Sequence, residues 1–255
     1  AVLATSFAVF PLLGLGIAHL PGLPETVGMG MLFLTLLPST VQSSIAFTSI
    51  AKGNVAGAVV SASASNILGV FLTPALVWLL MTRTSGVTFT TSTVVDIVAQ
   101  LLVPFVLGQL SRRWTAGFVT AHPELKLVDR GSIVLVVYSA FSAGMREGMW
   151  SQTSWTDIVA LLVISVLLLV IMLGLTWWAA RRLGFNRPDV IAIQFCGTKK
   201  SLASGLPMAG VLFAGAPIGL MVLPLMIFHQ AQLMACSALA ARYAKAAGAD
   251  AQASG

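Results

Sequence analysis

Residues 158–180 contain no charged side chain, and nearly all of them are apolar. A helix needs about 20 such residues to cross the hydrocarbon part of a bilayer, so this run is long enough to span a membrane. The whole chain has the same character, because 57% of its residues are hydrophobic and only 9% are charged. Soluble domains carry about 25% charged residues. The sequence therefore predicts an all-α polytopic membrane protein.

Apolar segments of similar length recur along the chain, separated by turn-forming or charged residues. The eight predicted spanning segments are Ala1–Leu20, Thr26–Ala51, Val55–Met81, Thr91–Leu110, Gly131–Met145, Asp157–Ala180, Asp189–Phe213 and Pro217–Ala241. The first is as apolar as a signal peptide. We interpret it as a spanning helix because it lacks a basic region before it and a clear cleavage site.

Basic side chains between the segments predict which side of the membrane each loop faces. With eight crossings, the side where the chain starts receives Lys52, Arg112, Arg113, Lys126, Arg130, Arg181, Arg182, Arg187, Arg242 and Lys245. The opposite side receives only Arg83 and Arg146. We therefore expect a multi-pass protein of a bacterial inner (plasma) membrane with a cytoplasmic C-terminus. The net charge of +6 then reflects loop bias, and we expect no nucleic-acid partner.

Two segments contain residues that interrupt a helix at membrane depth. Pro38 lies near the middle of the second segment, and proline removes a backbone hydrogen bond and clashes with the preceding turn. In the seventh segment, Lys199 and Lys200 lie between Gly197 and Gly205. A charge in a membrane costs roughly 3 kcal/mol and usually lines a cavity or has a partner. Both segments predict discontinuous helices, with a simple proline kink as the alternative for the second.

The two interruptions have related sequences. Thr40-Val-Gln-Ser43 matches Thr198-Lys-Lys-Ser201 five helices further along, so the two helices are expected to run in opposite directions. Such a pair is typical of inverted-repeat transporters with a site at the membrane midplane. Half-helix N-termini offer partial positive charge and free N–H groups, which suit an anion. The predicted binding residues here are Thr40, Gln42, Ser43, Thr198, Lys199, Lys200 and Ser201.

Two further polar residues are candidates for the same site. Asn66 follows serines and alanines that more simply predict close helix packing, but an amide in the membrane needs a partner. His229 lies within one turn of Gln230 and Gln232. A packing role is the alternative for this histidine.

No motif for catalysis, a metal or a cofactor accompanies these residues. Residues 197–201 differ from a phosphate-binding loop, which needs Gly directly before its Lys and a second Gly five residues earlier. The 3 histidines are scattered, and the 8 acidic residues lie at segment ends, in loops or in the tail. Cys196 and Cys236 fall in apolar segments and provide no disulfide framework. We expect no enzyme activity, no cofactor and no metal site.

Several motifs resemble the bile acid:sodium symporter superfamily, and the last three resemble its SBF-like bacterial branch. They are Pro38–Ser49, Ala51–Ala56, Ser61–Asn66, Phe195–Ala203 and Val222–Gln230. The resemblance runs from about Ala1 to Lys245 and implies ten helices in two inverted repeats of five. The fourth and ninth helices would be discontinuous and cross at the site. Eight of the ten helices would be present here, and the first two would be missing.

The resemblance also implies a division into domains. Residues 1–83 and 155–246 would form the two halves of a core domain. Residues 88–150 would supply panel-domain helices, and residues 247–255 would be a disordered tail.

The sequence departs from the sodium-coupled branch where sodium would bind. The ninth-helix carboxylate of that branch falls on Cys196, a glutamine one turn later falls on Lys200, and two hydroxyls fall on Ala58 and Ala62. A lysine and a sodium ion repel each other strongly at low dielectric. One hypothesis is that a lysine ammonium stands where the cation would be, as a fixed or a titrating charge.

The leading interpretation is a secondary active transporter of a small organic anion, working by alternating access in the lipid bilayer. It would not be coupled through the usual sodium sites. Adjacent helical residues point about 100° apart, so one of the two lysines would face the substrate, Lys200 by its match to a site glutamine, and Lys199 could pair elsewhere. One alternative is a Na⁺- or H⁺-coupled symporter of a bile-acid-like solute. Another is a membrane regulatory or scaffold protein that keeps the fold without transport.

Overall fold

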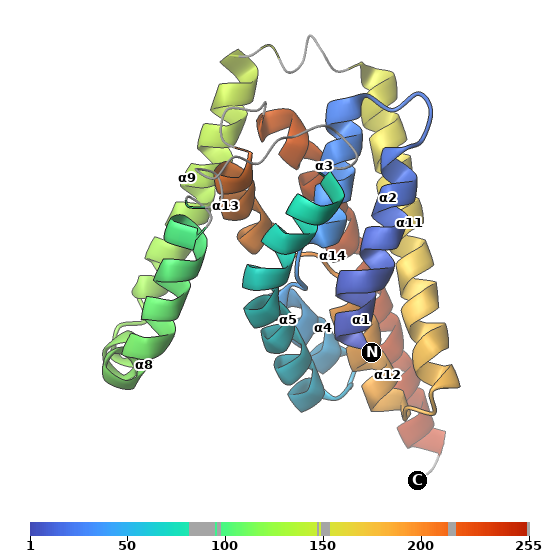
Figure 1. Ribbon diagram of the computed structural model, residues 1–255. Coiled ribbons are helices and arrows are strands. Elements are labelled where there is room, and N and C mark those ends of the chain that lie inside the picture. Colours follow the sequence, from blue (N-terminus) through green and yellow to red (C-terminus); the bar gives the residue numbers. More distant parts are fainter. Residues whose placement is uncertain (82–94, 96–97, 147, 149–153, 214–217, 254–255) are drawn as a thin grey trace.

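The computed structural model describes residues 1–255 apart from 82–94, 96–97, 147, 149–153, 214–217 and 254–255. All regular elements in the described part of the chain are helical, as predicted (Figure 1). Three helices are each long and apolar enough to cross a membrane, at Val55–Met81, Trp155–Arg182 and Ile218–Ala249. The protein is an all-helical polytopic membrane protein.

The helices follow the predicted segments in chain order, with π-helical turns marked η. Those of the first half are α1 (Val2–Ala4), η1 (Thr5–Val9), α2 (Phe10–Ala18), α3 (Glu25–Leu36), α4 (Val41–Ile50), α5 (Val55–Leu76) and η2 (Val77–Met81). Those of the second half are η3 (Val98–Leu102), α8 (Val103–Ala121), α9 (Leu125–Arg146), α11 (Trp155–Arg182), α12 (Arg187–Thr198), α13 (Leu202–Leu212) and α14 (Ile218–Ala253).

Some boundaries differ from the prediction. Helix α8 continues past Leu110 to Ala121, and α9 begins at Leu125 instead of Gly131. Helix α14 continues through residues 247–253, where the sequence predicted a disordered tail. Alanine has the highest helix propensity, and this stretch is rich in it. The predicted start of the fourth segment at Thr91 lies outside the described residues.

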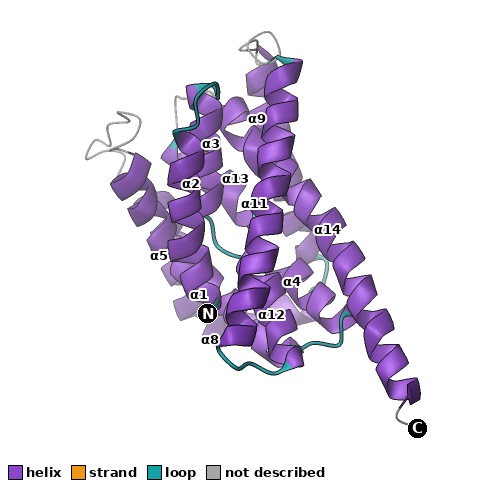
Figure 2. Ribbon diagram, turned by 90° about the vertical axis from the view of Figure 1, so that its right-hand side faces the viewer, coloured by secondary structure: helices purple, strands orange, loops and turns teal. Residues whose placement is uncertain are grey.

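Both predicted interruptions are present. Helices α3 and α4 are bent by 63° at the break between them, and together they are apolar enough to form one span. Helix α12 ends at Thr198 and α13 begins at Leu202. Figure 1 places α3 and α13 in the upper half of the molecule and α4 and α12 in the lower half, so the two broken helices run in opposite directions. Figure 2 shows short loops that interrupt helices at mid-height.

The loops predicted to carry the basic residues lie at one end of the molecule. The α4–α5 turn, which contains Lys52, and the α11–α12 loop, which ends where α12 begins at Arg187, are both at the lower end of Figure 1. The two chain termini are also in the lower half of this view. These two connections and both termini therefore lie toward the same end of the molecule.

Helices α3 and α14 approach closely at Gly30. A Cβ atom built on Gly30 would overlap the Met221 carbonyl oxygen and lie 2.9 Å from Pro224 Cγ. The nearest obstacle is backbone, which cannot move aside as a flexible side chain can. The contact between the two helices therefore requires glycine at this position.

We predict that Gly30→Ala lowers the stability of the protein by about 1–3 kcal/mol, because overpacking a well-packed interior forces backbone shifts. Thermal unfolding of the purified protein in detergent measures this change. Gly16→Ala in α2 is the matched control, because nothing lies within 4 Å of a Cβ built there. Equal melting temperatures for both variants would contradict the prediction.

Candidate functional site

The two helix breaks contact each other directly. The Ser201 N–H donates a hydrogen bond to the Pro38 carbonyl at 2.9 Å, which joins the α12–α13 break to the α3–α4 break. Thr40 Oγ1 donates to the Lys200 carbonyl at 2.7 Å, and Ser39 Oγ donates to the Cys196 carbonyl at 2.6 Å. Each break therefore supplies hydrogen-bond donors to backbone carbonyls of the other broken helix.

The Lys200 side chain is fully buried and points at the C-terminal end of α3. Its Nζ donates to the carbonyls of Thr35 at 2.8 Å, Leu37 at 2.7 Å and Ser6 at 2.9 Å. Nζ also lies 4.2 Å from the centre of the Phe10 ring. An ammonium group has three N–H donors, and here all three are used by backbone carbonyls.

The sequence explains why these three carbonyls are free. In η1 the Phe10 N–H bonds to the Thr5 carbonyl, and Pro11 has no N–H, so the Ser6 carbonyl has no partner within its own helix. Helix α3 ends before Pro38, which leaves its last carbonyls without the usual donors. The wide turn η1 and Pro38 together build a binding position for a cation.

The other open groups of the α3–α4 break are also satisfied by side chains. Thr73 Oγ1 donates to the Leu36 carbonyl at 2.8 Å. Ser65 Oγ accepts the Ser39 N–H at 3.0 Å, and Asn66 Nδ2 donates to the Ser39 carbonyl at 2.6 Å. The Asn66 amide oxygen in turn accepts from Ser204 Oγ at 3.0 Å. Helix α5 thereby holds the break in an extended conformation and links it to α13.

Gln232 of α14 fixes the second break at Lys200. The Lys200 N–H donates to Gln232 Oε1 at 2.9 Å, and Gln232 Nε2 donates to the Lys200 carbonyl at 2.8 Å. The remaining hydrogen of Nε2 faces His229 Nδ1 at 2.8 Å. Because an amide nitrogen only donates, Nδ1 accepts, and the proton of the neutral imidazole is on Nε2. His229 thus contacts the site through Gln232.

The Lys199 side chain is also fully buried but points elsewhere. Its Nζ lies 3.8 Å from the centre of the Phe47 ring and 5.5 Å from that of Phe195, and it has no hydrogen-bond partner. A desolvated cation–π contact contributes about 2 kcal/mol, whereas burying an ion costs several kcal/mol. The two neighbouring lysines therefore differ sharply, one with three acceptors and one with none.

The structure places the other predicted site residues as follows. Thr40, Asn66, Cys196 and Ser201 contact the opposite break or its neighbours through the bonds described above. The Thr198 hydroxyl instead faces Thr176 of α11 at 3.2 Å. Gln42 is exposed, and Ser43 Oγ is buried without a hydrogen-bond partner.

The predicted match between the two breaks is out of register. Thr198 is the last residue of α12, whereas Thr40 immediately precedes α4. The structural counterpart of Thr40 is Ser201, which immediately precedes α13. The match was based on residue types alone. Helix ends depend on backbone hydrogen bonds, which those residue types do not determine.

The N-termini of the two second half-helices differ. Ser201 Oγ accepts the Ser204 N–H at 3.2 Å and so caps α13. Thr40 does not cap α4, because its hydroxyl donates to Lys200 and accepts no N–H of the α4 first turn. The first-turn N–H groups of α4, next to the exposed Gln42, are left for a ligand or water.

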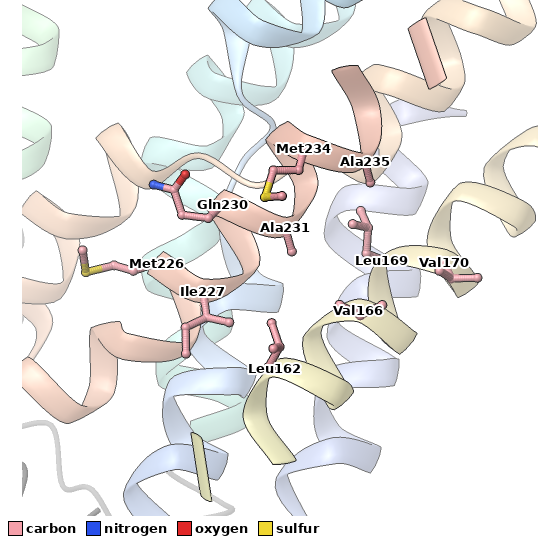
Figure 3. A pocket seen from close by; sticks show the side chains of 10 residues that line it. All are labelled: Leu162, Val166, Leu169, Val170, Met226, Ile227, Gln230, Ala231, Met234 and Ala235. Carbon is pink, nitrogen blue, oxygen red and sulfur yellow. The ribbon is translucent and has the colours of Figure 1, made fainter. Parts of the chain in front are cut away.

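A cavity of about 570 Å³ lies between α11 and α14 (Figure 3). Its lining residues are Leu162, Val166, Leu169, Val170, Met226, Ile227, Gln230, Ala231, Met234 and Ala235. None of them belongs to the two breaks, and several are exposed on the outer surface of the helices. We do not assign the site to this cavity.

Comparison with known proteins identifies the family. A sequence model of the SBF-like CPA transporter family matches residues 1–245. The chain belongs to this family. It is 52% identical over 247 residues to an uncharacterized Pseudomonas aeruginosa protein, covering 96% of this chain and 74% of that protein. It is 48% identical over 259 residues to YfeH of Escherichia coli (strain K12), by name a candidate symporter. This match covers 95% of this chain and 74% of YfeH.

A more distant relative is the Rattus norvegicus protein named sodium/bile acid cotransporter 7. The identity is 30% over 190 residues, which cover 73% of this chain and 56% of that protein. These findings confirm the resemblance to the bile acid:sodium symporter superfamily. They make the chain a member of a family of membrane transporters.

Within this family, the sodium position implied by the resemblance is apolar in this chain. Ala58, Ala62 and Cys196 pack with Val2 and Ala192 in one fully or almost fully buried cluster. The Cys196 thiol lies 3.7 Å from the Ala58 carbonyl, directed at it as a weak donor. The side chains of these five residues supply no oxygen ligand for a sodium ion. The Lys200 side chain is buried at the crossing and carries a cation of its own.

Proposed function

We propose that the protein is a secondary active transporter of an organic anion, working by alternating access in a bacterial plasma membrane with its C-terminus in the cytoplasm. The single observation that carries this proposal is the Lys200 ammonium, which is fully buried at the crossing and bound by three carbonyls. In discontinuous-helix transporters, carbonyls at half-helix C-termini coordinate the coupling ion, and half-helix N-termini bind the anionic part of the substrate. In our proposal Lys200 takes the ion's place.

The electrostatics of the crossing favour an anion. Lys200 and Lys199 are both buried, and within the described residues neither has a carboxylate against its ammonium group. Unbalanced positive charge at low dielectric attracts an anion strongly. The uncapped N-terminus of α4 adds partial positive charge on the same crossing. We propose that the substrate's anionic group binds there, against the N–H groups beside Thr40, Gln42 and Ser43.

The same arrangement argues against sodium coupling at the usual position. A buried ammonium repels a second cation, and the side chains of Ala58, Ala62 and Cys196 carry no oxygen that could bind sodium. The proposed transport cycle moves residues 1–83 and 155–246, as a core domain, against residues 88–150. The breaks are the natural places for backbone change in such a motion, because short loops absorb most of the φ/ψ change.

Counterflow in proteoliposomes tests the proposal, because it needs no ion gradient. Labelled taurocholate, pyruvate and citrate span organic anions of different size and charge. We expect uptake of at least one label against its unlabelled form, and loss of that uptake in Gln42→Leu. Gln109→Leu in α8 is the matched control on another exposed glutamine. If the folded protein moves none of the three, the non-transporting regulatory or scaffold function is favoured.

A further inference from the structure

We propose that Lys199 is a proton-exchange site and that its protonation couples a proton to the transport cycle. The inference rests on the proposed function for its coupling partner, the organic anion. The site itself follows from the contacts of Lys199, whose Nζ has no hydrogen-bond acceptor, whereas that of Lys200 has three.

The hydrogen bonds of Lys200 suit an ammonium group. All three of its hydrogens point at carbonyl oxygens, those of Ser6, Thr35 and Leu37. A neutral amine has only two hydrogens and a lone pair, so deprotonation would direct the lone pair at a carbonyl oxygen. The three acceptors therefore favour the ammonium form of Lys200, and Lys199 lacks any such acceptor.

Lys199 has no such restraint. Its Nζ faces the rings of Phe47 and Phe195 and has no hydrogen-bond acceptor. Loss of its proton would leave no carbonyl unsatisfied, and gain of a proton is stabilised by the two ring faces. Both protonation states fit the same packing, which is what a group that binds and releases a proton requires.

The position of Lys199 connects it to the moving part of the molecule. It is the residue directly after α12, in extended conformation at the break. Phe47 belongs to α4, the second half of the other broken helix, so Nζ lies between elements of both breaks. A change of angle at either break changes the surroundings of Nζ and its access to water.

The other titratable groups around Lys199 are Cys196 of α12, Cys236 and His229 of α14, and the adjacent Lys200. Helix α4 contributes the Phe47 ring to this environment. Among the described residues, the groups that act electrostatically on Lys199 are cysteines and include no carboxylate. In the proposed step the Lys199 amine takes one proton from water on one side of the membrane and returns it to water on the other. No other bond forms or breaks.

The test measures proton binding by the carrier without an organic anion. Proteoliposomes on a solid-supported membrane are stepped from alkaline to acidic buffer at constant sodium, with protons as the probe. We expect a transient charge displacement for the wild type. Lys199→Met, which is always neutral, and Lys199→Arg, which is always charged, should both lose it to the level of protein-free liposomes. Lys199→His should keep a displacement with a shifted midpoint.

Lys245→Met, at an exposed position in α14, is the matched control and should behave as the wild type. Lys199→Arg retains a cation that stacks on aromatic rings, so it separates loss of titration from loss of folding. A displacement that persists in both non-titrating variants would overturn the proposal. Counterflow distinguishes the two proposals. A Lys199-dependent charge displacement without counterflow of any organic anion would support the proton site and contradict the proposal of organic-anion transport.

Discussion

Lys200→Ala is expected to produce the largest loss of stability of any single substitution at the crossing. Three buried carbonyls, those of Ser6, Thr35 and Leu37, would lose their donor at once. Leaving a buried polar group unsatisfied costs roughly 1–3 kcal/mol, so we expect a decrease of about 3 kcal/mol or more. Thermal unfolding of the purified variant in detergent measures the decrease, and transport should be lost with it.

The same variant shows whether the carbonyls form a cation position. Removal of the lysine side chain leaves a space lined by three oxygens at a half-helix end, an environment in which transporters bind sodium. We expect sodium chloride to raise the melting temperature of Lys200→Ala relative to choline chloride, and to leave the wild type unchanged. A variant as stable as the wild type in choline chloride would show that the three hydrogen bonds contribute little.

Gln232→Leu is the second substitution with a large expected effect. The leucine removes a donor and an acceptor that pair with the Lys200 N–H and carbonyl. The carbonyl keeps its bond from Thr40, but the N–H is left without a partner. We expect a loss of about 2 kcal/mol of stability and a larger loss of transport, because the backbone that orients Lys199 and Lys200 is no longer fixed.

Gln230→Leu is the matched control, since Gln230 is two residues away on the same helix and exposed. It should retain the stability and the counterflow of the wild type. If Gln232→Leu and Gln230→Leu behave alike, the backbone around Lys200 does not depend on the Gln232 amide, and our description of the second break is wrong.

The sequence was sufficient to predict the architecture, because its signals are local. Pro38, the lysine pair and the long apolar runs each act on their own segment, and they predicted two broken helices in opposite orientation, as observed. The π-helical turn before Phe10 differs in this respect. The sequence of residues 5–9 does not predict a π-helical turn, because the stability of such a turn depends on packing against other helices.

The candidate site was only partly predictable, because its bonds join residues far apart in the chain. Ser39, Ser65, Ser204 and Gln232 were not among the predicted binding residues, although all four hold the breaks together. Gln232 had a usable signal, as a glutamine one turn from His229 in an apolar helix. No sequence signal predicted the direction of the Lys200 side chain. Adjacent helical residues were expected to diverge, but only the fold shows that Lys200 reaches the end of α3 while Lys199 reaches Phe47.

The measurement that tests the central claim most directly is the sodium dependence of uptake. Initial rates are compared for the organic anion that counterflow identifies, with sodium or choline outside, at equal pH and with the membrane potential clamped. If the Lys200 ammonium replaces the coupling cation, the two rates will be equal. A rate that requires external sodium would contradict the account, because a sodium ion would then bind and drive transport despite the fixed charge at the crossing.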